Sequence, residues 1–322
     1  MTRPYLTLRV SRFAAEAKDV ALLELQTLNG AKLAPFEPGA HVEVHLDNET
    51  IRHYSLLNDC AERDRYVIAV GLAPESRGGS KFIHTALRQG DHLKVSAPRN
   101  NFSLDTDAQY YCFIAGGIGI TPILSMIRWC IANGKHWRLV YTARNRQRAA
   151  FYETLLEFGA DNLCFHFNDE HAGRFLDIPS LIAGLREEEQ VYCCGPDPLM
   201  QAIKRATESL PSKRFHFEWF GASAPPAPPS AQTVERFSVT LRSTGRTFEV
   251  GPDQTILQVL EAQGIDTPFS CRSGICATCE IRVCEGIPDH RDFVLSEEEQ
   301  ALGKSMMICV SRSLSPSLTL DL

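Results

Sequence analysis

Residues 271–279 read Cys271-Arg272-Ser273-Gly274-Ile275-Cys276-Ala277-Thr278-Cys279, and a fourth cysteine, Cys309, follows thirty positions later. A C-x4-C-x2-C loop with one distant cysteine is the spacing that holds a [2Fe–2S] cluster. The loop must wrap around two irons, and its small residues let backbone N–H groups approach the sulfides. We therefore predict that the metal ligands are Cys271, Cys276, Cys279 and Cys309.

Two other roles are open to these cysteines. Zinc sites usually combine two C-x2-C pairs, whereas this set contains one. A buried structural role suits a cysteine taken singly, and we assign it to Cys284, which falls outside the spacing. The chain has 11 cysteines and no secretory start, so a disulfide scaffold is not expected.

Length, composition and charge limit the classes of protein to which the chain can belong. The 322 residues allow two or three domains, and 44% apolar with 22% charged residues is ordinary for a globular chain. A pI near 5.9 argues against nucleic-acid binding through a basic surface. Residues 108–127 are uncharged over a membrane-spanning length, but Gly116, Gly117, Gly119 and Pro122 would break such a helix. We expect a soluble, cytoplasmic protein with no membrane partner.

A proline-rich linker divides the chain. Ala222–Gln232 contains four prolines and no charge, which describes an extended connection. After it we expect a hairpin over Phe237–Val250, then a helix over Gln254–Gln263 capped by Asp253. The last 88 residues hold 13 acidic and 8 basic residues, so this final domain carries nearly all of the net charge of −6.

Two further patterns precede the linker. Up to about residue 102, short strand-like runs predict a small antiparallel barrel; they cover His41–Leu46, His53–Leu57, Tyr66–Leu72 and His92–Val95. From residue 110, strands alternate with helices, which predicts a parallel α/β sheet. The strands are Tyr111–Ala115, Trp137–Thr142 and Val191–Cys194, and the helices are Pro122–Asn133 and Ala149–Gly159.

The strand Arg52-His53-Tyr54-Ser55 has the residue types that a flavin needs. Arg52 can neutralise a phosphate, Tyr54 can stack on a planar ring, and Ser55 can hydrogen-bond flavin N5. Arg77-Gly78-Gly79-Ser80 then precedes a helix-like segment, Lys81–Leu87, whose free N–H groups suit an anionic phosphate. Taken alone, each motif is more often a surface strand or a simple turn.

A glycine turn follows the first strand of the predicted parallel sheet. It reads Gly116-Gly117-Ile118-Gly119-Ile120-Thr121-Pro122. Glycines here let the backbone approach a pyrophosphate at a helix N-terminus, although Pro122 stands where the dinucleotide fingerprint has its third glycine. Cys194-Gly195-Pro196 ends a second buried strand, at the edge where open α/β sheets bind ligands. Arg144, Arg146 and Arg148 suit a 2′-phosphate, or else form a solvated basic loop.

In this order, the motifs resemble the ferredoxin–NADP reductase superfamily, and residues 268–279 resemble a plant-type ferredoxin. The whole chain closely resembles the phthalate dioxygenase reductase and vanillate demethylase reductase family. The resemblance implies a multidomain fold. Its parts are an antiparallel β-barrel flavin domain (1–103), an α/β parallel-sheet NAD-binding domain (104–222), and a linker with an α+β, β-grasp ferredoxin-like domain (223–322).

The resemblance also implies site residues. It assigns Arg52, Tyr54, Ser55, Gly79 and Ser80 to the flavin, and it assigns Gly117, Thr121, Cys194 and Gly195 to the nicotinamide nucleotide. The further cofactor-binding candidates are their neighbours in these motifs, His53, Arg77, Gly78, Gly116, Gly119, Pro122 and Pro196, together with Arg144. Phe220, which ends Phe215–Phe220, is expected to shield the flavin, and the catalytic candidates are Ser55, Cys194 and Phe220.

Members of this family are reductase components of Rieske-type oxygenases. The resemblance implies that electrons pass from NADH through FMN, rather than FAD, and a [2Fe–2S] cluster to a terminal oxygenase. We expect this partner to dock on the acidic last domain. The alternatives are an NAD(P)H-dependent flavin- or ferredoxin-type reductase serving another acceptor, and a zinc-stabilised binding protein without redox activity.

Overall fold

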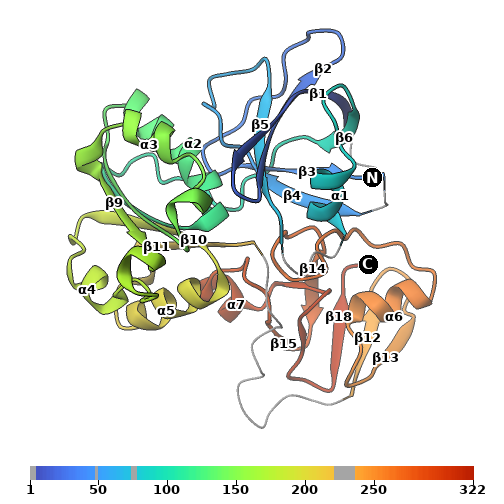
Figure 1. Ribbon diagram of the computed structural model, residues 1–322. Coiled ribbons are helices and arrows are strands. Elements are labelled where there is room, and N and C mark those ends of the chain that lie inside the picture. Colours follow the sequence, from blue (N-terminus) through green and yellow to red (C-terminus); the bar gives the residue numbers. More distant parts are fainter. Residues whose placement is uncertain (1–4, 48–49, 74–77, 221–235) are drawn as a thin grey trace. The chain divides into compact units, whose positions relative to one another are not determined.

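The computed structural model describes residues 5–47, 50–73, 78–220 and 236–322. The chain forms two compact units, Met1–Phe220 and Gly221–Leu322 (Figure 1). The first unit contains an antiparallel and a parallel sheet joined by a shared hydrophobic core. The predicted linker Ala222–Gln232 lies outside the described residues, and the division into three domains stays a prediction.

The antiparallel sheet of the first unit has the strand order β4-β3-β6-β1-β2-β5. Its elements are β1 (Tyr5–Ala17), β2 (Val20–Thr27), β3 (His41–His45), β4 (Ile51–Ser55), β5 (Tyr66–Gly71), α1 (Gly79–Thr85) and β6 (His92–Ser96). The sheet curls so that its edges meet, because Leu57 N–H, just past β4, donates to Val67 O on β5 at 3.0 Å. This arrangement confirms the predicted antiparallel barrel.

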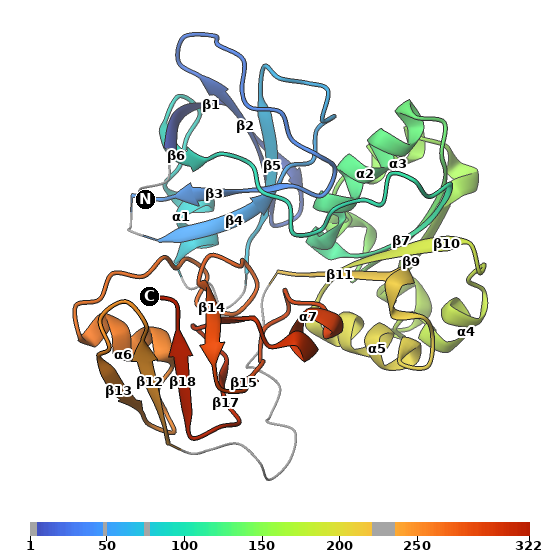
Figure 2. The same ribbon diagram turned by 180° about the vertical axis from the view of Figure 1, so that it is seen from behind.

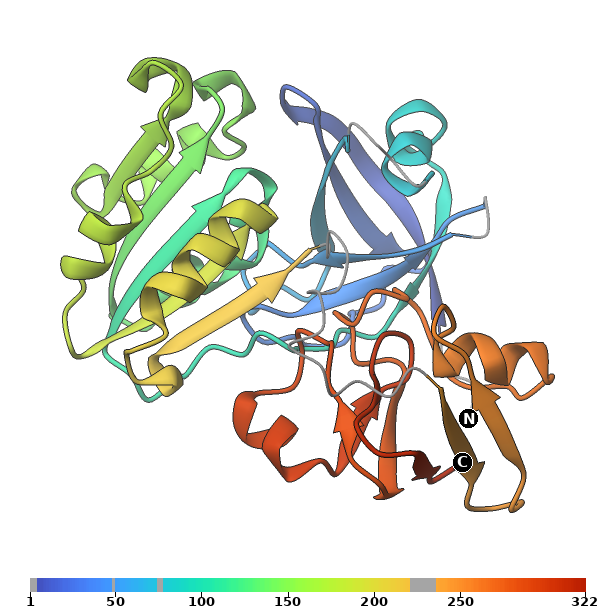
Figure 3. The ribbon, with the colours of Figure 1, turned by 90° about the horizontal axis from the view of Figure 1, so that it is seen from below.

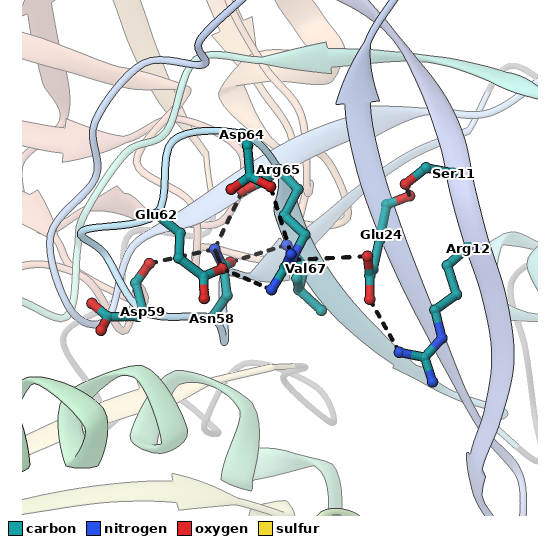
Figure 4. A network of polar contacts seen from close by, with 9 residues as sticks. All are labelled: Ser11, Arg12, Glu24, Asn58, Asp59, Glu62, Asp64, Arg65 and Val67. Carbon is teal, nitrogen blue, oxygen red and sulfur yellow. Dashed lines mark hydrogen bonds and ion pairs between the residues drawn. The ribbon is translucent and has the colours of Figure 1, made fainter. Parts of the chain in front are cut away.

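A polar network holds the segment after β4 against its neighbours (Figure 4). Asn58 accepts the Val67 N–H at Oδ1 (3.0 Å) and donates from Nδ2 to Arg65 O (3.2 Å). The Arg65 guanidinium in turn lies 3.8 Å from Glu24 on β2. Asn58 is buried, so these bonds replace the water that its amide loses. The network fixes the end of β4, where Ser55 lies.

The second sheet of this unit is parallel, with the order β11-β10-β7-β8-β9. Its strands are β7 (Tyr110–Gly116), β8 (His136–Ala143), β9 (Leu163–Phe167), β10 (Glu189–Gly195) and β11 (Phe215–Trp219). Its helices are α2 (Ile120–Ala132), α3 (Tyr152–Glu157), α4 (Ile178–Ala183) and α5 (Asp197–Thr207), and its short 3-10 turns are Gly117–Gly119, Arg146–Arg148, Ala160–Asn162, Asn168–His171 and Ser212–Arg214. Helices α2 and α3 cover one face, and α4 and α5 cover the other (Figures 1 and 3).

Strand order in this sheet reverses between β7 and β10. The chain runs outward from β7 through β8 to β9, then returns to the other side of β7 for β10 and β11. In open parallel sheets, ligands bind outside the carboxyl ends of the two strands that flank such a reversal. Both predicted nucleotide segments follow these two strands, so the topology confirms the predicted α/β sheet and places its binding edge.

The two sheets of the first unit pack through β5. Val67 and Ala69 join the core shared with the parallel sheet, whereas Ile68 and Val70 point into the barrel, as the two-residue period of a strand requires. The tip of the β1–β2 hairpin adds a hydrogen bond from Lys18 N–H to Gln147 O (2.9 Å). Strand β5 therefore supports both predicted cofactor regions.

The second unit is a mixed sheet with one covering helix. The sheet has the order β13-β12-β18-β14-β16, in which β12 and β18 are parallel; Figure 2 shows α6 beside it. Its elements are β12 (Phe237–Leu241), β13 (Thr247–Val250), α6 (Ile256–Ala262), β14 (Glu280–Glu285), β15 (Pro288–Asp289), α7 (Glu297–Leu302), β16 (Ser305–Met307), β17 (Arg312–Ser313) and β18 (Ser317–Leu320). The fold confirms the predicted α+β ferredoxin-like class.

Two local expectations change, and one hairpin adds to the predicted strands. The β1–β2 hairpin precedes the strand-like runs predicted from the sequence; its first strand ends in the alanine-rich Phe13–Ala17, and pairing with β2 makes this segment a strand. The expected helix Ala149–Gly159 begins only at Tyr152, since Phe151 has a left-handed φ of 62° and donates its N–H to Glu16. The cap of α6 is Thr255 and not Asp253, because Thr255 Oγ1 accepts the Gln258 N–H in a capping box.

No helix among the described residues is long and apolar enough to cross a bilayer.

Candidate functional site

Strand β4 carries the predicted flavin residues and separates them onto two faces. Arg52 and Tyr54 pair with Val44 and Val42 of β3 and share their side of the sheet. Tyr54 packs against the barrel core, and burial raises the pKa of its hydroxyl. His53 lies on the opposite face, where its ring meets the His41 ring edge-on at 5.3 Å.

Ser55 ends β4 and presents a buried hydroxyl. Its side chain is 4% exposed, and its Oγ has no hydrogen-bond partner among the described residues. A buried unpaired hydroxyl costs about 1–3 kcal/mol, so this atom fits a ligand that supplies the missing partner. The observation agrees with the expected hydrogen bond between Ser55 and a flavin.

Arg52 crosses the start of helix α1. A Cβ at Gly79 would lie 2.5 Å from Arg52 Nε and 2.7 Å from Arg52 Cγ, so only glycine leaves room for the arginine. Ser80 follows, and its Oγ accepts the Ala73 N–H at 3.3 Å. The structure thus brings Arg52 together with the predicted Gly79-Ser80 segment, whereas Arg77 lies outside the described residues.

The glycine turn after β7 packs against the end of β10. A Cβ at Gly116 would lie 2.5 Å from Pro196 Cδ, and one at Gly119 would lie 2.7 Å from Gly195 N and nearer still to the Cys194 carbonyl. These two glycines therefore allow the carboxyl ends of the two strands to touch. The structure brings the two predicted nucleotide segments together at the reversal of strand order.

Gly117 differs from its neighbours. Its φ is +52°, and a Cβ built there would meet no atom within 4 Å. The backbone here is therefore left-handed and open, as a turn that receives a phosphate requires. Thr121, by contrast, is 2% exposed and donates its hydroxyl to Ile118 O at 3.0 Å. This hydrogen bond from Thr121 to the Ile118 carbonyl stabilises the glycine turn itself.

Cys194 lies near the end of β10, beside a carboxylate that belongs to none of the sequence motifs. Glu218 of β11 pairs with Cys194, and one of its carboxyl oxygens is buried with no partner among the described residues. Burial raises the pKa of Glu218 to about 8. Burial, and then the nearby Glu218, raise the pKa of the Cys194 thiol well above its usual value. The feature of the sequence that could have identified Glu218 is its position as a carboxylate within the largely apolar run Phe215–Phe220.

Glu218 makes stability depend on pH. Its pKa is about 8 in the fold against an ordinary value of 4.5, so the folded state keeps a proton that the unfolded chain releases. Stability should therefore fall by about 1.4 kcal/mol per pH unit between these two values. Glu218→Gln cannot ionise, and its melting temperature relative to the parent should rise by several degrees from pH 5.5 to pH 8. A constant difference between the two proteins would contradict this account.

The remaining predicted residues are the arginines that follow β8 and Phe220, which follows β11. Arg146 contacts Glu170 (3.4 Å) and Arg148 contacts Asp19 (2.5 Å), while Arg144 is exposed and has no ion-pair partner among the described residues. Arg144 is thus the only one of the three arginines without an ion-pair partner among the described residues. Phe220 is 40% exposed, and in the described part of the chain no ring contact joins it to Tyr54.

The four predicted ligands meet in the second unit. The Cys271 sulfur lies within hydrogen-bond reach of Cys276 and Cys309, and Cys309 also reaches Cys279. Cys276, Cys279 and Cys309 are at most 4% exposed. Within the described ranges, no three His, Cys, Asp or Glu side chains are spaced as ligands around a single ion; the four thiols contact one another.

Backbone donors in the loop point at these sulfurs. Ser273 N–H lies 3.3 Å from Cys271 Sγ, and Cys271 N–H lies 3.5 Å from Cys276 Sγ. Left-handed φ values at Arg272 (54°), Gly274 (68°) and Ala277 (55°) let the short loop wrap inward. Four converging sulfurs with N–H donors fit a [2Fe–2S] cluster, whose charge such bonds stabilise.

Comparison with known proteins agrees with this geometry. Residues 239–314 match the family of 2Fe-2S iron-sulfur cluster binding domains, and residues 113–205 match the oxidoreductase NAD-binding domain. The chain superposes on the crystal structure of phthalate dioxygenase reductase with a TM-score of 0.72 and 39% identity, covering 99% of this chain and 98% of that one. This chain belongs to the phthalate dioxygenase reductase family. Two curated relatives have similar identity over nearly the whole length.

The first is phenoxybenzoate dioxygenase subunit beta of Ectopseudomonas oleovorans, 44% identical over 98% of this chain and 97% of its own length. The second is tetrachlorobenzoquinone reductase of Sphingobium chlorophenolicum, 43% identical over 100% of both chains. The findings confirm the predicted family and the predicted enzyme class, an oxidoreductase with NAD-binding and [2Fe–2S] domains.

Proposed function

We propose that this phthalate dioxygenase reductase relative is the reductase component of a Rieske-type non-haem iron oxygenase system. It passes electrons from NADH through FMN and a [2Fe–2S] cluster to the terminal oxygenase. One observation carries the proposal: a flavin-type strand and a nucleotide-binding sheet edge lie in one unit, and a three-cysteine loop that meets Cys309 lies in the other unit of the same chain.

The residues have separate tasks in this proposal. When bound, flavin accepts the two electrons that NADH gives as a hydride and releases them singly, as a cluster requires. Arg52 and Gly79-Ser80 bind the flavin phosphate, Tyr54 lies against its ring, and Ser55 holds a hydrogen bond at N5. Gly78 and His53 belong to the same proposed cofactor region, and Arg77, which the sequence also predicts there, lies outside the described residues.

The nicotinamide nucleotide lies on the turn Gly116–Pro122 in this proposal. Cys194, Gly195 and Pro196 border the same edge, and Arg144 lies at its rim. Phe220 covers the flavin until the nicotinamide arrives, which keeps water away from the reacting atoms. Burial, and then the nearby Glu218, raise the pKa of the Cys194 thiol well above its usual value, so Cys194 borders this edge as a neutral thiol.

The choice of FMN rests on the R-G-G-S segment after β4, which members of the family that bind FMN carry. We also place the protein in the cytoplasm, where NADH is available and thiols stay reduced. None of the 11 cysteines, all of which lie among the described residues, forms a disulfide, which agrees with that compartment.

A second acceptor class has specific support. The relative from Sphingobium chlorophenolicum is named a tetrachlorobenzoquinone reductase and matches this chain over its whole length. A quinone is thus the alternative acceptor, and it would take electrons from the same flavin or cluster.

The cofactor content of the purified protein tests the proposal. We expect one FMN, two irons and two sulfides per chain, with visible absorbance from both chromophores that NADH bleaches under anaerobic conditions. Mass analysis of the released flavin separates FMN from FAD. A colourless protein that contains zinc would contradict the proposal and support the binding-protein alternative.

A further inference from the structure

A short segment of the second unit lies against the cysteine loop. Its central residue, Asp292, has 0% exposure of its side chain. A Cβ at Gly274 would lie 2.7 Å from Val310 Cγ2, 3.1 Å from Asp292 Cα and 3.4 Å from Asp292 Cβ, so the loop and this segment pack closely at a glycine. The next residue, Phe293, donates its N–H to Gly274 O at 2.9 Å.

Gly274 connects this segment to a cluster ligand. Its N–H is a hydrogen-bond donor to Cys309 Sγ, while its carbonyl accepts from Phe293. The reduction potential of an iron–sulfur cluster depends on hydrogen bonds to its sulfurs and on nearby charge. Residues that hold Gly274 in place therefore influence the potential without touching the irons.

The two carboxylate oxygens of Asp292 differ in their hydrogen bonding. One oxygen, Oδ2, accepts the N–H groups of Val294 (3.1 Å) and Leu295 (2.8 Å). The other, Oδ1, is buried and has no hydrogen-bond partner among the described residues. His290 Nδ1 lies 3.7 Å from it, which is beyond a hydrogen bond.

The turn that the Asp292 side chain forms with Val294 and Leu295 does not by itself require an aspartate at this position. Asparagine makes the same side-chain turn with one oxygen and carries no charge. Burying a carboxylate oxygen without a partner costs free energy, and the nearby Arg291 does not compensate, since it pairs with Asp289 at 2.7 Å. The charge of Asp292, beside the loop, is the feature that needs a function.

We propose that Asp292 is a positioning residue that sets the reduction potential of the cluster. It holds Gly274 against Cys309, and its negative charge opposes the electron that the cluster accepts. The inference rests on the proposed function only in requiring that the cluster is present. The charge should hold the potential lower than the cysteine loop alone would set it.

The test is potentiometric titration of the intact protein, followed by the electron paramagnetic resonance signal of the reduced cluster. Asp292→Asn keeps an oxygen for the Val294 and Leu295 N–H groups and removes the charge. The one-electron equilibrium should shift about tenfold toward the reduced cluster, about 59 mV. A unit charge within ~12 Å at an effective dielectric constant of ~20 produces that change.

Asp321→Asn is the matched control. Asp321 is an exposed carboxylate paired with Arg242 at 3.5 Å, so solvent screens it, and its loss should leave the potential unchanged. Asp292→Ser gives a second test, because serine keeps an acceptor oxygen and also lacks the charge. It should shift the potential in the same direction as Asp292→Asn.

Two results would overturn the inference. The first is an unchanged potential in Asp292→Asn with a full complement of iron. The second is loss of the cluster from both Asp292 variants, because the carboxylate would then be a folding requirement and not a control on potential. A parent protein without any [2Fe–2S] signal would instead contradict the proposed function, and this inference with it.

Discussion

Cys279→Ser should stop electron delivery to the oxygenase while NADH-driven reduction of ferricyanide continues at close to the parent rate. Cys279 is 2% exposed and lies among the four converging sulfurs, whereas the flavin and nucleotide regions belong to the other unit. Loss of a residue that only supports a metal ligand costs about 10–100-fold. Loss of a ligand itself should therefore reduce delivery at least about 100-fold.

Cys284→Ser is the control for this change. Cys284 lies on β14, outside the loop, and its sulfur contacts Arg242 Nη1 at 3.9 Å. This variant should keep both activities and the full iron content. If Cys279→Ser still reduced the oxygenase at the parent rate, the cluster would lie off the electron pathway.

Gly119→Ala should abolish NADH oxidation. The new Cβ would lie 2.7 Å from Gly195 N and closer still to the Cys194 carbonyl, and backbone atoms cannot move aside as a flexible side chain does. The clash separates the ends of β7 and β10 and costs about 2 kcal/mol or more in unfolding free energy. Thermal unfolding and the steady-state rate of NADH oxidation measure the two consequences.

Alanine substitutions at two other glycines distinguish an effect on nucleotide binding from an effect on folding. Gly117 (φ +52°) and Gly134 (φ +62°) are both left-handed, and a Cβ at either would meet nothing within 4 Å. Alanine at each should therefore cost the same ~1–2 kcal/mol of backbone strain. Only Gly117→Ala should raise the KM for NADH, by roughly tenfold, because Gly117 lies on the proposed nucleotide edge. Equal KM values in the two variants would remove the nucleotide from this turn.

The cysteine loop and the glycine turn were more predictable from the sequence than the elements around them. The spacing of the cysteines at 271, 276 and 279 predicts the cluster. These three sulfurs and that of Cys309 must converge on two irons, and a short loop can supply three of them only at a fixed spacing. The glycines at 116 and 119 carry a similar constraint, since two strand ends touch there. Such motifs are local, so a single sequence reveals them.

Features that depend on distant contacts were not predictable in this way. The end of β1 is a strand because β2 pairs with it, against its alanine-rich composition. Glu218 acquires its raised pKa from burial in the folded unit, and its own segment resembles any apolar strand. Asp292 gains its contact with Gly274 from a neighbouring loop that lies 18 positions away in sequence.

The most direct test of the central claim is anaerobic reduction of a purified Rieske oxygenase by NADH, with the holoprotein in catalytic amount. If the chain is the oxygenase reductase, the oxygenase cluster will be reduced at a rate proportional to the amount of this chain, with one NADH consumed for every two clusters. An oxygenase that stays oxidised while NADH bleaches the flavin and the cluster of this chain would show that the oxygenase is not its electron acceptor. A quinone reduced under the same conditions would then identify the acceptor class.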